Sequence, residues 1–344
     1  MLQIADDQVE SGPPDGESTL RSWRELDVKL GPAGKKKDLK RTGQLLRAAG
    51  ATPSTTRTKL DRALGPSLPD ISAEPSTLGE LVAAYVAVQC DVLASNDVGL
   101  RTGAPEVHQT RVAARRLRST LRVFGDLVDA APGEKLNDEL AWYAELLGQV
   151  RDRDVLSRRL TELIADLPVD QVRGPVEAEI TKALAAERDE ALERLNEAMR
   201  TRRYQHLMQL LRGWKTAPPL TDTADAEDKT ATRYVKEAKR KADKRLRRAD
   251  DDVELLHRAR KAFKRARYGA ELVEPADKKM KGIAREAKNL QTLLGEHQDC
   301  IVAADFLARM SSAGKRETRS AFTYGVLMAN ELDRAADIRE SLRN

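Results

Sequence analysis

The chain has 344 residues, and its 60 Lys and Arg against 55 Asp and Glu leave a formal net charge of +5, too small to identify an anionic partner. Aromatic residues at 4% and charged residues at 33% suit an all-α fold of one large or two ordinary domains. The two cysteines suggest no disulfide framework, and without an eighteen-residue apolar run or a signal peptide the sequence predicts a bacterial-type cytoplasmic protein with no membrane segment.

The first 75 residues differ in character from the rest of the chain. Residues 11–17 are rich in turn formers, residues 23–30 alternate charged with apolar side chains as a half-exposed strand does, and residues 38–49 can form a short helix. This order, followed by the segment AAGATPSTTRTKLDRAL, resembles the C-terminal end of a CYTH domain, a tunnel fold that processes triphosphates. Residues 1–75 are therefore expected to be a partial CYTH-like segment that is disordered in part.

One short motif in this segment suggests chemistry. Glu25-x-Asp27-x-Lys29 resembles the E-x-E-x-K signature of CYTH enzymes, in which carboxylates hold a divalent metal and the lysine helps bind a phosphate. In the family the signature lies on the first strand of a barrel, whereas only about 45 residues follow it here, too few for eight strands. A leftover strand is favoured, in a chain that starts partway through an ancestral tunnel domain; residual triphosphate hydrolysis is an alternative.

Helical patterns begin at Ser76, where Pro75-Ser76-Thr77 supplies an N-cap. The expected order is a helix over 78–94, a loop over 99–105, a basic helix over 107–128, a turn at 131–133, helices to about 213, a linker over 214–230, a helix over 232–248, capping acids at 250–252, a second basic helix, a break at Pro275 and helices to the C-terminus. The linker is polar, acidic and without periodicity. The helical part therefore divides into residues 76–213 and 231–344.

Residues 107–128 carry two stripes at helical spacing. The first stripe is apolar: Val107, Thr110, Ala114, Leu117, Leu121, Phe124 and Val128. The second lies about 100° round the helix and is basic, beginning with a histidine: His108, Arg111, Arg115, Arg118 and Arg122. Because no acidic residue falls between residues 107 and 125, one face is built for burial and the next is uniformly positive.

The same design returns in residues 256–273. The apolar stripe here is Leu256, Ala259, Phe263, Ala266, Ala270 and Val273, and the basic stripe is His257, Arg260, Lys264 and Arg267. Both copies place cations three, seven and ten residues after the histidine, with an extra cation at eight, which is Arg116 or Arg265. The spacing indicates a duplicated helix.

This spacing resembles the two halves of a CHAD domain, an α-helical domain named for its histidines. Two further matched segments support the resemblance: residues 147–155, LGQVRDRDV, follow the first basic helix, and residues 294–299, LGEHQD, follow the second. The resemblance covers roughly residues 76–344. It implies two antiparallel bundles of about four helices each, related by internal pseudo-symmetry, and a family without known catalysis.

The repeated stripes call for an anionic ligand, because like charges four residues apart destabilise a helix unless a partner neutralises them. From His108 to Arg118 is about 15 Å along the axis, long enough to address several successive phosphates. Proteins that bind single-stranded nucleic acid need aromatic side chains for the bases, and only Tyr268 lies off the apolar stripes. Inorganic polyphosphate is therefore favoured, and an RNA-binding module is the alternative.

The CHAD resemblance implies the same ligand, since the family is known for binding inorganic polyphosphate through basic residues on its paired bundles. Carried over residue by residue, the role falls on His108, Arg111, Arg115, Arg116, Arg118, His257, Arg260, Lys264, Arg265 and Arg267. Arg122 and Lys261 extend the stripes in this chain. The expected function is non-enzymatic binding in a positive groove, with no cofactor, no metal and no catalytic residue.

Weaker candidates for phosphate contact lie outside the main stripes. They are Tyr268, Lys281, Arg285, Lys288, His297, and Arg151 and Arg153 near the first matched turn. Asp152 and Asp299 occupy equivalent places and are expected to cap a helix or to anchor neighbouring arginines rather than to bind metal. The sequence leaves open the oligomeric state, an association with polyphosphate granules and whether the two stripes face each other.

Overall fold

The computed structural model describes residues 2–11, 21–30, 36–54, 75–101, 107–312 and 318–343. The chain divides into two compact units, Met1–Glu74 and Pro75–Asn344. Three parts of the sequence discussed above lie outside the described residues: the turn-rich stretch over 12–17, the end of the segment AAGATPSTTRTKLDRAL, and the loop residues Gly103 and Pro105. The described part is predominantly helical, and the all-α class is confirmed.

The first unit contains an antiparallel hairpin, β1 (Leu2–Ser11) and β2 (Arg21–Leu30), and the helix α1 (Lys36–Ala48). The alternating pattern predicts β2 correctly but misses β1, in which adjacent Asp6 and Asp7 interrupt the alternation. On β2, Lys29 Nζ lies 3.0 Å from Asp27 Oδ2, and Trp23 Nε1 donates to Glu25 Oε2 at 2.8 Å. Among the described residues, no three His, Cys, Asp or Glu side chains are grouped as metal ligands.

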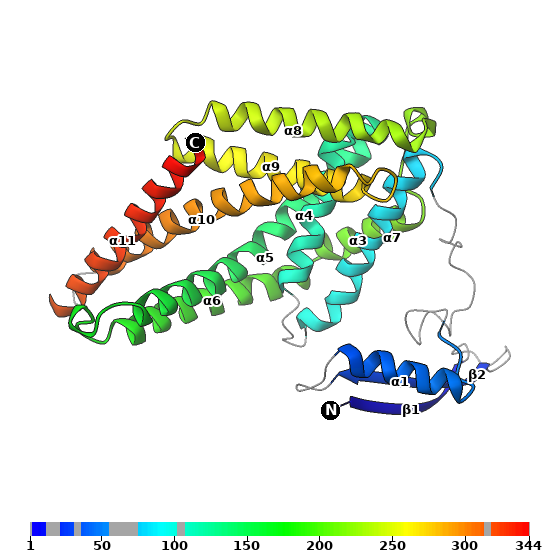
Figure 1. Ribbon diagram of the computed structural model, residues 1–344, viewed down its shortest axis with the longest axis horizontal. Helices are drawn as coiled ribbons and strands as arrows, with labels where there is room; N and C mark the ends of the chain where they lie inside the picture. Colours follow the sequence, from blue (N-terminus) through cyan, green and yellow to red (C-terminus); the bar gives the residue numbers. More distant parts are fainter. Residues whose placement is uncertain are drawn as a thin grey trace. The chain divides into compact units, whose positions relative to one another are not determined.

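The second unit is built from helices in two consecutive sets (Figure 1). The first set is α3 (Leu78–Arg101), α4 (Val107–Val123), α5 (Ala130–Ala165), α6 (Val176–Met199) and α7 (Arg202–Thr216). The second set is α8 (Ala231–Arg247), α9 (Val253–Val273), α10 (Met280–Ser312) and α11 (Thr318–Arg343). Helices α5 and α6 pack as one long pair and α10 and α11 as another, while α4 packs against α9.

The helix starts follow their capping residues. Glu80 N donates to Thr77 Oγ1, and Thr77 N donates to Glu80 Oε2, both at 3.2 Å, which closes a capping box at the start of α3. Asp252 caps α9 by accepting from Leu255 N at 2.8 Å. Helix α3 extends to Arg101, so Gly99 is helical and its placement in a loop was wrong.

Two expected turns are absent from the described structure. The turn at 131–133 was wrong, because α5 starts at Ala130 and Pro132 lies in its first turn, where proline costs no hydrogen bond. The matched segments 147–155 and 294–299 lie in the interiors of α5 and α10 rather than at turns. The basic helix α4 is also shorter than expected, since it ends at Val123 before a 3₁₀ turn.

The largest hydrophobic cluster joins both sets of helices. It includes Leu78, Phe124 and Leu147 from the first set and Tyr234 and Leu272 from the second, each at most 7% exposed. Helix α3 is long and apolar enough by composition to span a bilayer, and in this structure its buried side chains belong to this core.

The segment between α7 and α8 is held against the first set. Backbone bridges join Thr77 to Glu227 and Val128 to Leu220, and the segment contains two short 3₁₀ turns, Asp222–Asp225 and Asp228–Thr230. Trp214, assigned to the linker by its sequence, is buried in α7. The acidic segment therefore runs along the helices with defined contacts.

Candidate functional site

The two basic helices cross closely. A Cβ atom on Gly269 of α9 would lie 3.2 Å from Val123 Cγ1 of α4, so the backbones approach each other at this point. The buried face of α4 contains Ser119 and Thr120, whose hydroxyls donate to the carbonyls of Arg115 and Arg116 at 2.8 and 3.1 Å. Small and internally satisfied side chains allow the crossing, which brings cations of both helices together.

Four of these cations form what we call the central seam: Arg111 and Arg115 from α4, and Arg260 and Lys264 from α9. Burial, together with the charges of Arg260, Arg115 and Arg111, lowers the pKa of Lys264 to about 6. Burial also lowers the pKa of Arg115 and of Arg260. The two stripes thus lie side by side, with their cations close enough to repel one another.

The central seam contains buried hydrogen-bond donors without partners. The Nε atoms of Arg115 and Arg260 are buried and have no hydrogen-bond partner among the described residues. A buried donor left without a partner costs about 1–3 kcal/mol, so native proteins seldom keep one without a reason. One seam arginine in each basic helix carries this cost, which is typical of a site that acts on a ligand.

Each half places one seam arginine over a glycine. A Cβ atom on Gly148 of α5 would lie 3.3 Å from Arg111 Nη2, and a Cβ atom on Gly295 of α10 would lie 3.1 Å from Arg260 Nη2. Both glycines belong to the matched Leu-Gly segments. The absence of a side chain there lets each guanidinium lie against the neighbouring helix.

Two carboxylates lie near the seam. Asp152 Oδ1 is 3.2 Å from Arg111 Nη1, so Asp152 anchors an arginine from the interior of α5 and does not cap a helix. Burial raises the pKa of Asp299, while the charge of Arg260 acts in the opposite direction. Two carboxylates beside three arginines leave the seam positive even while Lys264 is neutral.

The duplicated histidines border the seam. Burial lowers the pKa of His108, and the charges of Arg151, Arg115 and Arg111 lower it further. Burial likewise lowers the pKa of His257, whose Nδ1 lies 3.0 Å from Gln298 Oε1. Both histidines favour the neutral form in the free protein, and a nearby anion would favour their protonation.

Beyond the central seam, side chains of the basic stripes form two further charged clusters, which we call the first corner and the second corner. At the first corner Glu271 binds both Arg116 and Arg267, and Tyr268 lies beneath the two guanidiniums at 5.6 and 5.2 Å. Tyr268 is 3% exposed, so its assignment as a surface contact was wrong: it packs inside the helical unit. The second corner contains Arg118, Arg122 and Arg265.

Arg245 of α8 joins the second corner and was missed by the sequence patterns. Burial, together with the charges of Arg245, Arg122 and Arg118, lowers the pKa of Arg265 to about 10. Arg245 lies in a mostly basic run, KRKADKRLRR over residues 239–248, which by itself resembles an ordinary solvated helix face. Its equivalent in the first copy, 149 residues earlier, is Asn96, so the repeat gives no signal for it.

Most secondary candidates lie away from the seam. Lys281, Arg285 and Lys288 are exposed, as is Lys261, which extends the second stripe. Glu286, between Arg285 and Lys288 in sequence, binds Lys239 of α8 at 2.8 Å. His297 is 1% exposed and its Nε2 lies 3.3 Å from Arg339 Nη1. Its assignment as a phosphate contact was wrong, because it is a core residue.

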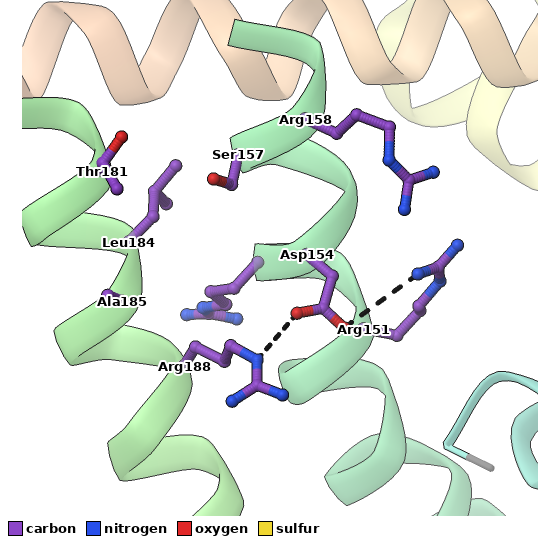
Figure 2. Close-up of a pocket in the computed structure, with 9 residues that line it drawn as sticks. Arg151, Asp154, Ser157, Arg158, Thr181, Leu184, Ala185 and Arg188 are labelled. Carbon is purple, nitrogen blue, oxygen red and sulfur yellow. Dashed lines mark hydrogen bonds and ion pairs between the residues drawn. The ribbon is translucent and has the colours of Figure 1, made fainter. Parts of the chain in front are cut away.

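Arg151 and Arg153 line a separate pocket of about 390 Å³ between α5 and α6. Figure 2 shows Asp154 between Arg151 and Arg188, at 4.0 and 2.8 Å. Arg153 Nε binds Glu187 at 3.2 Å. These arginines therefore have carboxylate partners, unlike most of those in the seam.

A duplicated basic helix at the crossing of two helical sets defines the class of this protein. The sequence profile of the CHAD domain matches residues 84–308, and the chain belongs to the CHAD domain family. The family is associated with polyphosphate.

Individual proteins resemble this chain in sequence or in fold. The uncharacterized proteins Rv2226 and MT2285, from Mycobacterium tuberculosis strains H37Rv and CDC 1551, are each 31% identical to this chain over 348 residues. The alignments cover 96% of the chain and 66% of each relative, so the chain spans about two thirds of their length. The structure of PptA from Streptomyces chartreusis has the same fold, with a TM-score of 0.64 and 22% identity over 78% of this chain and 98% of that one.

Proposed function

We propose that this protein binds inorganic polyphosphate without catalysing its turnover, and that the central seam is the main contact. The observation that carries the proposal is the meeting of Arg111, Arg115, Arg260 and Lys264 with one ion pair, to Asp152, among the described residues. Self-repulsion destabilises such a cluster until an anion binds. A chain of phosphates supplies repeated negative charge at a spacing that cations on two helices can follow.

The chemistry of the side chains suits phosphate oxygens. Arginine presents a rigid fork of donors that matches a phosphate, and lysine adds a point charge. Each cation that meets the polyanion displaces condensed counterions, so affinity should fall steeply as salt rises and should increase with chain length. The matched glycines beneath Arg111 and Arg260 hold both guanidiniums in place before the ligand arrives.

RNA binding is the competing function, and the burial of Tyr268 weighs against it. A single-stranded RNA site needs exposed aromatic rings for stacking, and this ring is covered by Arg116 and Arg267. A ligand with phosphates and no bases needs no such platform. Residual triphosphate hydrolysis would need a metal site, which the described residues of the first unit do not assemble.

The test is a titration with long-chain polyphosphate, tripolyphosphate and single-stranded RNA at two salt concentrations. We expect tight, salt-sensitive binding of the long chain and a loss of at least 100-fold when the four seam cations are replaced by alanine, since a charged hydrogen bond contributes about 1.5–3 kcal/mol. The matched control replaces four exposed cations elsewhere: Lys182, Arg200, Arg202 and Arg212. Equal or tighter RNA binding, or metal-dependent phosphate release, would contradict the proposal.

A further inference from the structure

The two corners of the basic stripes occupy equivalent places in the repeat, yet they contain different charges. Residues 149 positions apart correspond, as His108 corresponds to His257. By this rule Arg116 corresponds to Arg265, Arg118 to Arg267, Tyr85 to Tyr234, and Glu271 to Arg122. One acidic residue in the second copy is therefore replaced by a cation in the first.

At the first corner the acid occupies the space between two guanidiniums. Arg267 Nε donates to Glu271 Oε1 at 2.7 Å, and Arg116 Nη2 donates to Glu271 Oε2 at 3.2 Å. One carboxylate thus bridges two helices with both oxygens. The first corner already contains the anion that its cations require.

At the second corner the equivalent cations have no such partner. Arg265 and Arg118 converge on Arg122, and Arg245 of α8 adds a fourth guanidinium. No ion pair joins these four side chains to a carboxylate within the described ranges. Asn137 Oδ1 is 3.5 Å from Arg118 Nε, while Asp138 and Glu145 attract Arg118 only at longer range.

A small pocket opens at this corner between α4, α8 and α9. Its volume is about 70 Å³, and Arg122, Tyr234, Lys241, Arg245 and Arg265 are among its lining residues. Glu237 also lines it, but its carboxylate binds Lys241 at 2.7 Å. The volume is far below the roughly 300–1,000 Å³ of drug-sized ligand sites, so it suits one compact anionic group.

We infer that Arg118, Arg122, Arg245 and Arg265 bind a single phosphate group in the position that the Glu271 carboxylate occupies at the first corner. The inference rests on the proposed function for the chemistry of the ligand, but it concerns a contact separate from the central seam. The group is either free orthophosphate or one phosphate of a longer chain. The asymmetry gives the protein one filled corner and one open corner.

Exchanging the two residues that differ tests the inference. Arg122→Glu should copy the first corner: the new carboxylate should bind Arg118 and Arg265, raise the Tm and weaken orthophosphate binding at least tenfold. Glu271→Arg should copy the second corner: it should lower the Tm and increase stabilisation by orthophosphate. The measurement is Tm against orthophosphate concentration, with chloride adjusted to constant ionic strength, and Arg212→Glu is the control for net charge.

Two outcomes would overturn the inference. One is an Arg122→Glu protein that keeps the full orthophosphate response; the other is a wild-type protein that phosphate stabilises no more than chloride does. If Arg122→Glu does not fold, Arg245→Ala takes its place, and an undiminished response then overturns the inference. The four-alanine seam variant separates the two proposals, because it should lose long-chain polyphosphate while keeping the orthophosphate response. Retained long-chain binding in that variant contradicts the proposed function alone.

Discussion

Two clusters of charge join the two sets of helices, and their composition is opposite. Arg159 of α5 donates to Glu331 Oε2 of α11 at 2.7 Å and to Glu296 Oε1 of α10 at 2.9 Å. The central seam gathers three arginines and Lys264, with one ion pair, to Asp152, in the part of the chain that the structure describes. Carboxylates of the same helical unit neutralise Arg159, whereas the seam lacks the negative charge that would neutralise its arginines.

The pKa shifts of the arginines express the same difference. Burial by itself lowers the pKa of Arg159, but the hydrogen bonds to Glu331 and Glu296 raise it above the ordinary value. Burial lowers the pKa of Arg115, and nearby Arg111 lowers it further. Burial acts in the same direction at both places, so the partners decide whether a buried arginine supports the fold or is available to a ligand.

The largest expected effect follows from removing an acid of the complete cluster. Glu331 is 1% exposed, and Glu331→Ala leaves Arg159 buried with one partner fewer, which should lower the free energy of unfolding by about 3–5 kcal/mol. Urea denaturation measures it. Glu187→Ala, which removes a more exposed partner of Arg153, should cost less than about 1 kcal/mol. Similar losses in the two variants would show that the Arg159 cluster is not structural.

A smaller effect is the pH dependence of polyphosphate affinity, which we expect to come from Lys264 on the α9 side of the seam. Lys264 has a pKa of about 6 in the free protein, so it is neutral at pH 7–9, and a polyanion favours its charged form. Binding then takes up a proton, and affinity should fall as pH rises, by up to about tenfold per unit. Lys264→Arg should flatten this dependence, measured by titration between pH 7 and 9, above the histidine range.

The stability of the free protein should change with pH in the opposite direction. An unfolded lysine holds its proton up to about pH 10.4, whereas folded Lys264 releases it near pH 6. Between these values the unfolded state binds more protons, so the contribution of Lys264 to stability rises with pH. Lys264→Met should remove this contribution, and an unchanged slope of stability against pH would contradict the shifted pKa.

The smallest effect concerns the glycines beneath the seam. Gly148→Ala and Gly295→Ala should move Arg111 and Arg260 by a few tenths of an ångström and weaken polyphosphate binding about fivefold, near 1 kcal/mol. Alanine favours a helix, so stability should stay equal or rise. Gly213→Ala is the matched control, because nothing lies within 4 Å of its Cβ position. Equal polyphosphate affinities in the three variants would contradict the idea that the two glycines position Arg111 and Arg260.

The sequence predicted the helices and the capping at Thr77 and Asp252, because each depends on local patterns of three or four residues. It missed β1 and the start of α5, because Pro132 and Gly133, which suggest a turn, are also compatible with the first turn of a helix. It also placed the cations on two stripes without showing that the stripes adjoin. Their contact depends on the crossing of α4 and α9, and no spacing within one helix encodes it.

Individual site residues show the same limit. Tyr268 lies off the apolar stripe in sequence but is buried, because the neighbouring helix covers a face that an isolated helix would expose. Arg245 was missed for the opposite reason: its own helix looks solvated, and the packing of α8 against α4 and α9 places it beside Arg122 and Arg265. A pattern can report the face of a helix, whereas the partner of that face is a property of the fold.

The contact of Gly269 with Val123 has a consequence for how the cations are spaced. The 3.2 Å between that Cβ position and Val123 Cγ1 is set inside the helical unit, by the size of two apolar residues. A bulkier residue at position 269 would move the two rows of guanidiniums apart without touching any of them. The distance between the two rows of guanidiniums is thus set by packing in the core, and we expect it to be independent of ionic strength and pH.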